Sequence, residues 1–142
     1  MMNLYFAYGS NMWLAQMAER CPDHRLLGVG VLKGYRWIIS SRGYANIIKS
    51  PTDVVYGVVY EISVSDEAHL DVSEGVRVGS YYKEFLHLEV GGSYTNCLVY
   101  IDPIVDEGEP GGAYIIRINL GIEDAKLPSE YVQNSIRKYV PG

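Results

Sequence analysis

Apolar and polar residues alternate with the period of a β-strand through most of the first two thirds of this chain. The strand-like runs cover residues 2–8, 25–32, 35–41, 45–49, 54–62, 81–90 and 93–101. The run 54–62 is the densest in β-branched and aromatic residues, and Gly57 within it indicates a bulge or a close approach of another backbone segment. Gly91 and Gly92 separate the last two runs and predict a tight hairpin. The pattern therefore predicts strands that follow one another in a mostly antiparallel sheet.

Helical patterns are short and stand between or after these strands. We expect a first helix up to about Arg20, with Asn11 as its N-cap. Ser63 and Asp66 have the spacing of a capping box, which predicts a second helix that ends near Glu74.

The last third of the chain is less regular. Residues 114–120 fit either a strand or a helix, because their isoleucines alternate over a short segment. Pro128 opens a final helix in which Val132, Ile136 and Val140 fall on one face. Strands followed by helices indicate the α+β class, with a barrel-like sheet.

Composition and charge narrow the classes of protein. A chain of 142 residues that is 48% hydrophobic can bury one sizeable core, so we expect a single domain over residues 1–142. The formal charge of −5 and the scattered cations argue against a nucleic-acid partner. No run approaches the ~20 apolar residues of a membrane-spanning helix, and the start lacks a signal-peptide pattern. We expect a cytoplasmic protein without a membrane partner.

The sequence lacks the motifs of metal sites, serine hydrolases and nucleotide-binding loops. Cys21 and Cys97 are isolated thiols, and the three histidines lack the spacing of a metal site, so we expect no metal. Neither the Gly-x-Ser-x-Gly elbow of serine hydrolases nor a Gly-x-x-x-x-Gly-Lys nucleotide loop is present.

Two segments remain as candidates for chemistry. Residues 5–11 pass from a strand into a helix through Gly9, and the N–H groups of such a turn can hold a carboxylate or an oxyanion. An ordinary connection between a strand and a helix has the same pattern. The second segment is the acidic corner at residues 70–76, which contains Asp71 and Glu74. A carboxylate at a helix end is also typical of an exposed surface.

Five segments taken together resemble the γ-glutamylcyclotransferase family. They are Tyr5-Phe6-Ala7-Tyr8-Gly9-Ser10-Asn11, Ala45-Asn46-Ile47 with Ser50-Pro51, Tyr56-Gly57-Val58-Val59-Tyr60, Leu70-Asp71 with Glu74-Gly75-Val76, Gly79 and Tyr81, and residues 121–128. They occur in the family's order over nearly the whole chain, which makes chance a poor explanation. The resemblance implies a mixed, mostly antiparallel small β-barrel with flanking short helices. It also implies a homodimer.

The activity that the resemblance implies is the conversion of a γ-glutamyl amino acid into 5-oxoproline and a free amino acid. The substrate's α-amine attacks its own γ-carbonyl, so the reaction requires no cofactor, metal or nucleophilic side chain. Glu74 is then the general acid/base, and partial burial would suit this role by raising its pKa above about 4.3. Asp71 either raises that pKa further or caps the helix or faces solvent.

The resemblance also implies which residues bind the small-molecule γ-glutamyl substrate. They are Tyr5, Phe6, Ala7, Tyr8, Gly9, Ser10 and Asn11 of the turn, together with Tyr114 and Tyr81. The chain has 13 tyrosines, and packing is the default role for any one of them. Asn11 favours the branch that acts on γ-glutamyl amino acids, because relatives that act on glutathione or γ-glutamylamines tend to have leucine there.

Two alternatives to this activity stay open. One is a related cyclotransferase that acts on a γ-glutamylamine, on glutathione or on a carrier-bound γ-glutamyl group. The other is a non-catalytic module that binds a small molecule in the same pocket. If the acidic loop at residues 106–112 borders the site, we expect it to disfavour acidic leaving amino acids.

Overall fold

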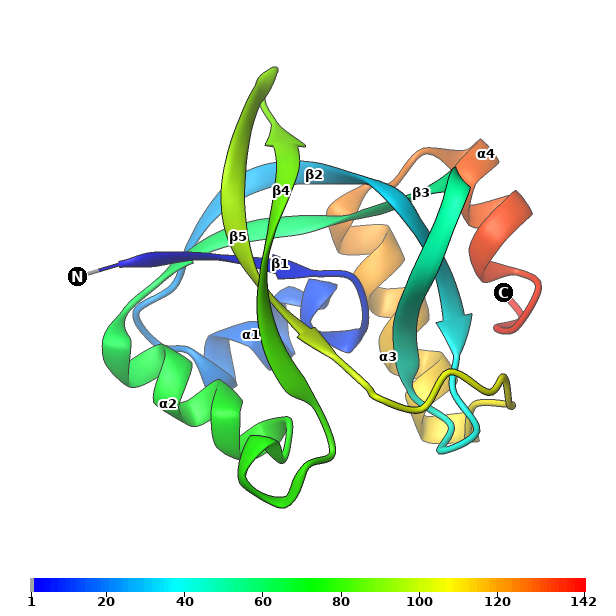
Figure 1. Cartoon of the computed structure of the whole chain (residues 1–142), viewed down its shortest axis with the longest axis horizontal. Coiled ribbons are helices and arrows are strands. Elements are labelled where there is room, and N and C mark those ends of the chain that lie inside the picture. The colour runs from blue at the N-terminus through cyan, green and yellow to red at the C-terminus, as the bar shows by residue number, and fades with distance from the viewer. Residues whose placement is uncertain (1) are drawn as a thin grey trace.

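The strands of this protein form a closed barrel in the computed structural model, which describes residues 2–142. Within that range five strands are ordered β1-β3-β2-β4-β5 around the barrel (Figure 1). They are β1 (Asn3–Ala7), β2 (Arg25–Ile39), β3 (Ala45–Ile62), β4 (Tyr82–Val90) and β5 (Ser93–Ile101). Neighbouring strands are antiparallel except β1 and β5, which pair in parallel at Tyr5 and Leu98. The predicted α+β class with a mostly antiparallel barrel is confirmed.

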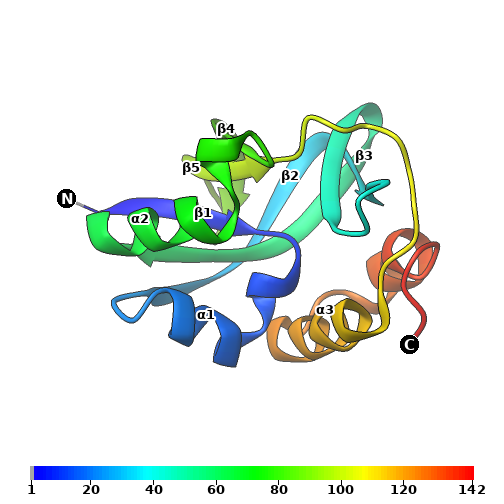
Figure 2. The same cartoon turned by 90° about the horizontal axis from the view of Figure 1, so that it is seen from below.

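Short helices flank the barrel, and two of them lie against the turn that follows β1. The helices are α1 (Leu14–Arg20), α2 (Val64–Ser73), α3 (Gly112–Ala125) and α4 (Ser129–Tyr131), with the short turns η1 (Ser10–Met12), η2 (Val76–Val78) and η3 (Val132–Ile136). Figure 2 shows α1 and α3 on the same side of the barrel, with η1 between them. Of the helices within residues 2–142, none has both the length and the apolar character needed to cross a membrane.

β2 and β3 are each longer than the sequence pattern predicted. β2 joins the predicted strand 25–32 to most of the predicted strand 35–41 and ends at Ile39, and β3 joins 45–49 and 54–62. The predicted breaks were wrong because the ladder continues past them with a shifted register: Lys33 pairs with Val54, whereas Tyr35 pairs with Lys49. The four residues between Lys49 and Val54 stand opposite Gly34 alone, and the ladder continues past this irregularity without ending either strand.

The interior of the barrel requires a close approach at Gly57. A Cβ atom at this position would lie 2.4 Å from the carbonyl oxygen of Ala7 and 2.8 Å from the Phe6 ring. Gly57 pairs in register with Gly30, so the close approach that the sequence allowed is present and the bulge lies elsewhere. Phe6, Val59 and Leu88 lie against this pair of glycines and are fully buried. Each such burial stabilises the fold by roughly 1.5–3 kcal/mol.

The predicted helices are confirmed in part. The capping box of α2 is present, since the Ser63 side chain accepts from Asp66 N–H while the Asp66 side chain accepts from Ser63 N–H. Helix α1 begins only at Leu14, and Asn11 lies in η1, so the prediction that Asn11 caps α1 was wrong. The ambiguous residues 114–120 lie within helix α3.

The helix predicted from Pro128 is real but irregular. It begins as the short α4 and continues as the π-helical turn η3, where Val132 and Ile136 are buried. Val140, the third residue of the predicted face, is also buried.

Candidate active site

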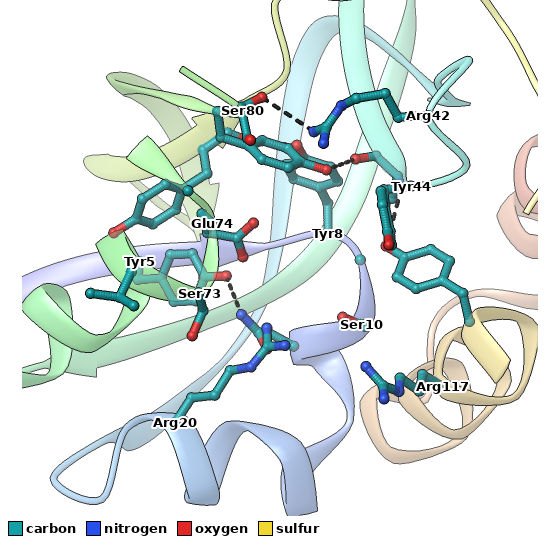
Figure 3. A pocket seen from close by; sticks show the side chains of 18 of the residues that line it. Tyr5, Tyr8, Ser10, Arg20, Arg42, Tyr44, Ser73, Glu74, Ser80 and Arg117 are labelled. Carbon is teal, nitrogen blue, oxygen red and sulfur yellow. Dashed lines mark hydrogen bonds between the residues drawn. The ribbon is translucent and has the colours of Figure 1, made fainter. Parts of the chain in front are cut away.

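A cavity of about 360 Å³, which we call the inner cavity, opens where the chain leaves β1 and enters η1 (Figure 3). Its wall combines the β1–η1 turn, the end of α1, the β2–β3 turn, the segment after α2, and parts of β5 and α3. Glu74 and the turn at Gly9 and Ser10 line it together. The barrel thus brings the two candidate segments of the sequence to one hollow.

Glu74 is placed by the end of helix α2. Its N–H donates to the carbonyl of Leu70 at 2.8 Å, and Gly75, in the left-handed conformation with φ 63°, turns the chain away from the helix axis. The side chain points into the inner cavity (Figure 3). Within residues 2–142 no hydrogen bond or ion pair joins the Glu74 carboxylate to another residue. This carboxylate is therefore free to interact with a molecule in the cavity.

The surroundings of Glu74 make its carboxylate a stronger base than that of an exposed glutamate. Burial raises the pKa of Glu74 above its usual value, and the guanidinium groups of Arg20 and Arg42 oppose that rise. Burial and the nearby Glu74 carboxylate also raise the pKa of Tyr5 and Tyr8, so both phenols are neutral at ordinary pH. A carboxyl group whose pKa is moved toward neutrality is a more effective proton acceptor and donor.

Asn11 holds the turn in place. Its Nδ2 donates to the Tyr5 hydroxyl at 2.9 Å, and its Oδ1 accepts from Gln16 Nε2 at 2.8 Å and from Arg20 Nη1 at 3.1 Å. Its backbone carbonyl accepts from the Tyr60 hydroxyl at 2.8 Å. Asn11 thus joins β1, η1, α1 and β3, which fixes the conformation of the β1–η1 connection.

Gly9 allows two other segments to approach this turn. A Cβ atom at Gly9 would lie 3.1 Å from the Cβ of Ala45 and 3.2 Å from the hydroxyl of Tyr114. The preceding residue, Tyr8, donates its hydroxyl to the carbonyl of Tyr100 at 2.5 Å. A larger residue than glycine at position 9 would push Ala45 and Tyr114 away from the turn.

Tyr81 and Tyr114 meet at the backbone of Ala45. The Tyr114 hydroxyl accepts from Ala45 N–H at 3.1 Å, and the Tyr81 hydroxyl donates to the Ala45 carbonyl at 3.0 Å. Burial raises the pKa of Tyr114 to about 12, so its phenol is neutral at ordinary pH. Both tyrosines line the inner cavity.

The turn and Glu74 occur in a chain that is similar to known proteins over nearly all of its length. The model of the AIG2-like family matches residues 54–134. The gamma-glutamylcyclotransferases of Homo sapiens and Mus musculus are 30% and 31% identical to this chain over 152 residues, which cover 98% of this chain and 79% of each relative. The chain belongs to the γ-glutamylcyclotransferase family.

A solved structure described as a gamma-glutamyl cyclotransferase has the same fold. It superposes with a TM-score of 0.89 at 27% sequence identity, and the match covers 100% of this chain and 90% of that chain. The resemblance inferred from the five sequence segments is confirmed.

All but one of the residues that we expected to bind substrate line the inner cavity. Those that line the inner cavity are Tyr5, Phe6, Tyr8, Gly9, Ser10, Asn11, Tyr81 and Tyr114. Ala7 does not line it, because it is buried in the barrel with its carbonyl oxygen facing Gly57. The roles of these residues and of Glu74 stay predictions.

Three arginines also line the inner cavity, and the sequence contained no signal for them. Arg20 ends α1, Arg42 lies in the β2–β3 turn, and Arg117 lies in α3. From the sequence we considered that the acidic loop at residues 106–112 could border the site and disfavour acidic leaving amino acids. This loop is not part of the cavity wall. Cations, together with Glu74, supply the charge around the site.

Arg42 connects the segment after Glu74 to the barrel. Its Nη2 donates to Asp102 Oδ2 at 2.9 Å and to the Ser80 carbonyl at 3.2 Å, and its Nε donates to Asp102 Oδ2 at 3.1 Å. The guanidinium carbon lies 5.6 Å and 5.3 Å from the ring centres of Tyr44 and Tyr81. These contacts fix Arg42 beside the cavity.

Asp71 has partners of its own. Its carboxylate accepts from the Tyr100 hydroxyl at 2.8 Å and from Lys83 Nζ at 3.1 Å. Asp71 therefore joins the end of α2 to β4 and β5 and does not cap the helix.

Metal ligands do not gather at the site. Across the described residues 2–142, no cluster of three or more His, Cys, Asp or Glu side chains could hold a metal ion. Cys21 and Cys97 are buried free thiols.

Proposed function

We propose that this protein converts γ-glutamyl amino acids into 5-oxoproline and free amino acids. The observation that carries the proposal is the Glu74 carboxylate, which faces the Gly9 turn across the inner cavity and has no partner among residues 2–142. A cavity of about 360 Å³ is of the size that holds a small ligand. The relatives named gamma-glutamylcyclotransferase support the same reaction.

In the proposed mechanism Glu74 moves one proton. Its carboxylate removes a proton from the α-ammonium group of the substrate, and the free amine attacks the γ-carbonyl carbon to close the five-membered ring. The bond between that carbon and the leaving nitrogen then breaks as Glu74 returns the proton to the leaving nitrogen. The ring nitrogen still has one proton more than a lactam, and this second proton passes to the departing amine, so that 5-oxoproline and an ammonium group are the products. No water is consumed, and the tethered nucleophile can contribute roughly 7–11 kcal/mol relative to a bimolecular reaction.

The turn at Gly9 and Ser10 has the complementary role in this proposal. The γ-carbonyl oxygen gains negative charge during the attack, and backbone N–H groups at the start of η1 would stabilise it or hold the glutamyl α-carboxylate. The hydrogen bonds of Asn11 keep this turn in one conformation before substrate arrives. Tyr81 and Tyr114 would form the wall against which the glutamyl chain folds back.

The proposal is tested with purified protein and γ-glutamyl-alanine, with 5-oxoproline and alanine measured by chromatography. We expect the two products in equal amounts from the wild-type protein and almost none from Glu74→Gln. Unchanged production by Glu74→Gln would refute the mechanism. Turnover of only glutathione or a γ-glutamylamine would favour the alternative activity, and binding of all these compounds without turnover would favour a binding module.

The assembly and the cellular setting are further parts of the proposal. From the family resemblance we expect a homodimer that works in the cytoplasm and contributes to glutathione metabolism. Light scattering on the purified protein measures the dimer directly, and a monomer at micromolar concentration would contradict it.

A further inference from the structure

A second hollow of about 520 Å³, which we call the outer hollow, adjoins the inner cavity. Both hollows share part of their wall, which consists of Arg20, Val72, Ser73 and Arg117. A ligand in the inner cavity that extends toward the outer hollow would therefore contact this shared wall. Figure 3 shows Arg20 and Arg117 on the same side of the site, across from Arg42.

The three arginines differ in how many hydrogen bonds and ion pairs their guanidinium groups already form. Arg42 is bound to Asp102 by two nitrogens. Arg20 donates one hydrogen bond, to Asn11 Oδ1. The side chain of Arg117 makes no hydrogen bond or ion pair with any of residues 2–142 and lies at the exposed surface of α3. A guanidinium group has five donors in a planar arrangement that suits a carboxylate, so Arg117 has its full binding capacity free.

The acidic residue of the outer hollow does not neutralise this wall. Glu19 lines the outer hollow beside His69, and no ion pair joins Glu19 to Arg20 or Arg117 among the described residues. Two arginines therefore face one glutamate there, and the hollow keeps a surplus of positive charge.

The substrate of the proposed function has a carboxylate on each side of the bond that breaks. The glutamyl α-carboxylate is on the same carbon as the amine that must reach Glu74, so it lies deep in the inner cavity. The carboxylate of the leaving amino acid lies beyond the scissile nitrogen. Arg42 lines only the inner cavity, whereas Arg20 and Arg117 also line the outer hollow, and Arg20 is already bound to Asn11. Arg117 is thus the cation on the leaving side.

We propose that Arg117 binds the carboxylate of the leaving amino acid where the inner cavity adjoins the outer hollow. This contact makes the site selective for γ-glutamyl amino acids over γ-glutamylamines, which have no carboxylate at that position. The inference rests on the proposed function and adds a specificity-determining residue to it. The outer hollow has room for different side chains of the leaving amino acid, so the site recognises the carboxylate of that amino acid and not its side chain.

The test compares γ-glutamyl-alanine with γ-glutamyl-ethylamine, which differ mainly by that carboxylate. We expect Arg117→Gln to lower kcat/KM for γ-glutamyl-alanine about 10-fold, mainly through a higher KM, because a charge-assisted hydrogen bond is lost in the bound state. For γ-glutamyl-ethylamine we expect a change of less than about twofold, since that substrate never makes the contact. The ethylamine rate of the same variant also shows that it is folded.

Two matched variants complete the experiment. Arg117→Lys keeps the charge and should recover part of the γ-glutamyl-alanine activity. Arg77→Gln removes an exposed arginine that does not line either hollow, and it should leave both substrates unchanged. Equal losses on both substrates with Arg117→Gln, or no loss on either, would overturn the inference. Wild-type protein that forms no 5-oxoproline from either compound would instead refute the proposed function.

Discussion

Glu74 and Asp102 are carboxylates that both interact with the charge of Arg42, and their surroundings differ completely. Asp102 is fully buried and accepts hydrogen bonds from Arg42, from the Ser40 hydroxyl at 3.2 Å and from the N–H of Ile104 at 2.8 Å. Glu74 is recessed in the inner cavity and has none of these partners within the described residues. Arg42 is therefore bound directly by Asp102, whereas it acts on Glu74 only through its charge.

The comparison shows how a fold keeps one acid for structure and leaves another for chemistry. A buried carboxylate whose oxygens are satisfied can hold segments together, whereas an unsatisfied one is destabilised in its charged form. That destabilisation appears as the raised pKa of Glu74. We therefore expect substitutions of Glu74 to affect activity and substitutions of Asp102 to affect stability.

The largest expected effect is the loss of activity in Glu74→Gln. We expect kcat for γ-glutamyl-alanine to fall about 10²- to 10⁴-fold, the usual contribution of a general acid/base. Because burial raises the pKa of folded Glu74, its charge opposes folding at neutral pH, and stability increases as pH falls through that pKa. Glutamine removes this charge, so the thermal midpoint at pH 7 should stay equal or rise. A clear drop in that midpoint would show that Glu74, like Asp102, stabilises the fold.

Asp102→Asn should have the next largest effect, on stability. We expect the free energy of unfolding, measured with urea, to fall by about 2 kcal/mol, because the Arg42 guanidinium loses its charged partner. Asp106→Asn is the matched control, since Asp106 is exposed on the following loop and should change stability very little. Equal stabilities of the two variants would contradict the structural role of Asp102.

Arg42 should affect both carboxylates. In Arg42→Gln the pKa of Glu74 loses an opposing charge and rises further, so the acidic limb of the pH profile for kcat/KM should move to higher pH by up to about one unit. Arg42→Lys retains the charge and should keep the limb in place. An acidic limb that is the same in all three proteins would show that Arg42 does not act on Glu74.

Asp71 should have the smallest effect. Lys83 and Tyr100 hold its carboxylate, so we expect Asp71→Asn to move the acidic limb by less than about 0.2 pH units. A limb displaced to lower pH would mean instead that the charge of Asp71 raises the pKa of Glu74.

Features that depend on neighbours in the chain could be predicted well. The capping box joins residues three positions apart, and the Gly91–Gly92 hairpin requires the positive φ angles of 58° and 84° that both glycines adopt. The helix at residues 114–120 could not be settled in this way. Its alternating isoleucines also suited a strand, and its place as a helix is stabilised by the close packing of Gly121 against Met12 in η1.

The order of strand-forming and turn-forming residues, together with the five family segments, was sufficient to predict the α+β barrel. The same segments also indicated Glu74 and the Gly9 turn as the candidate site. Local pattern could not place the arginines, because Arg20, Arg42 and Arg117 lie in different elements and no periodicity relates them. Closing the barrel and packing α1 and α3 around η1 brings them to one cavity. Charge acts through space, so the state of Glu74 and the binding capacity left to Arg117 depend on neighbours that are distant in sequence.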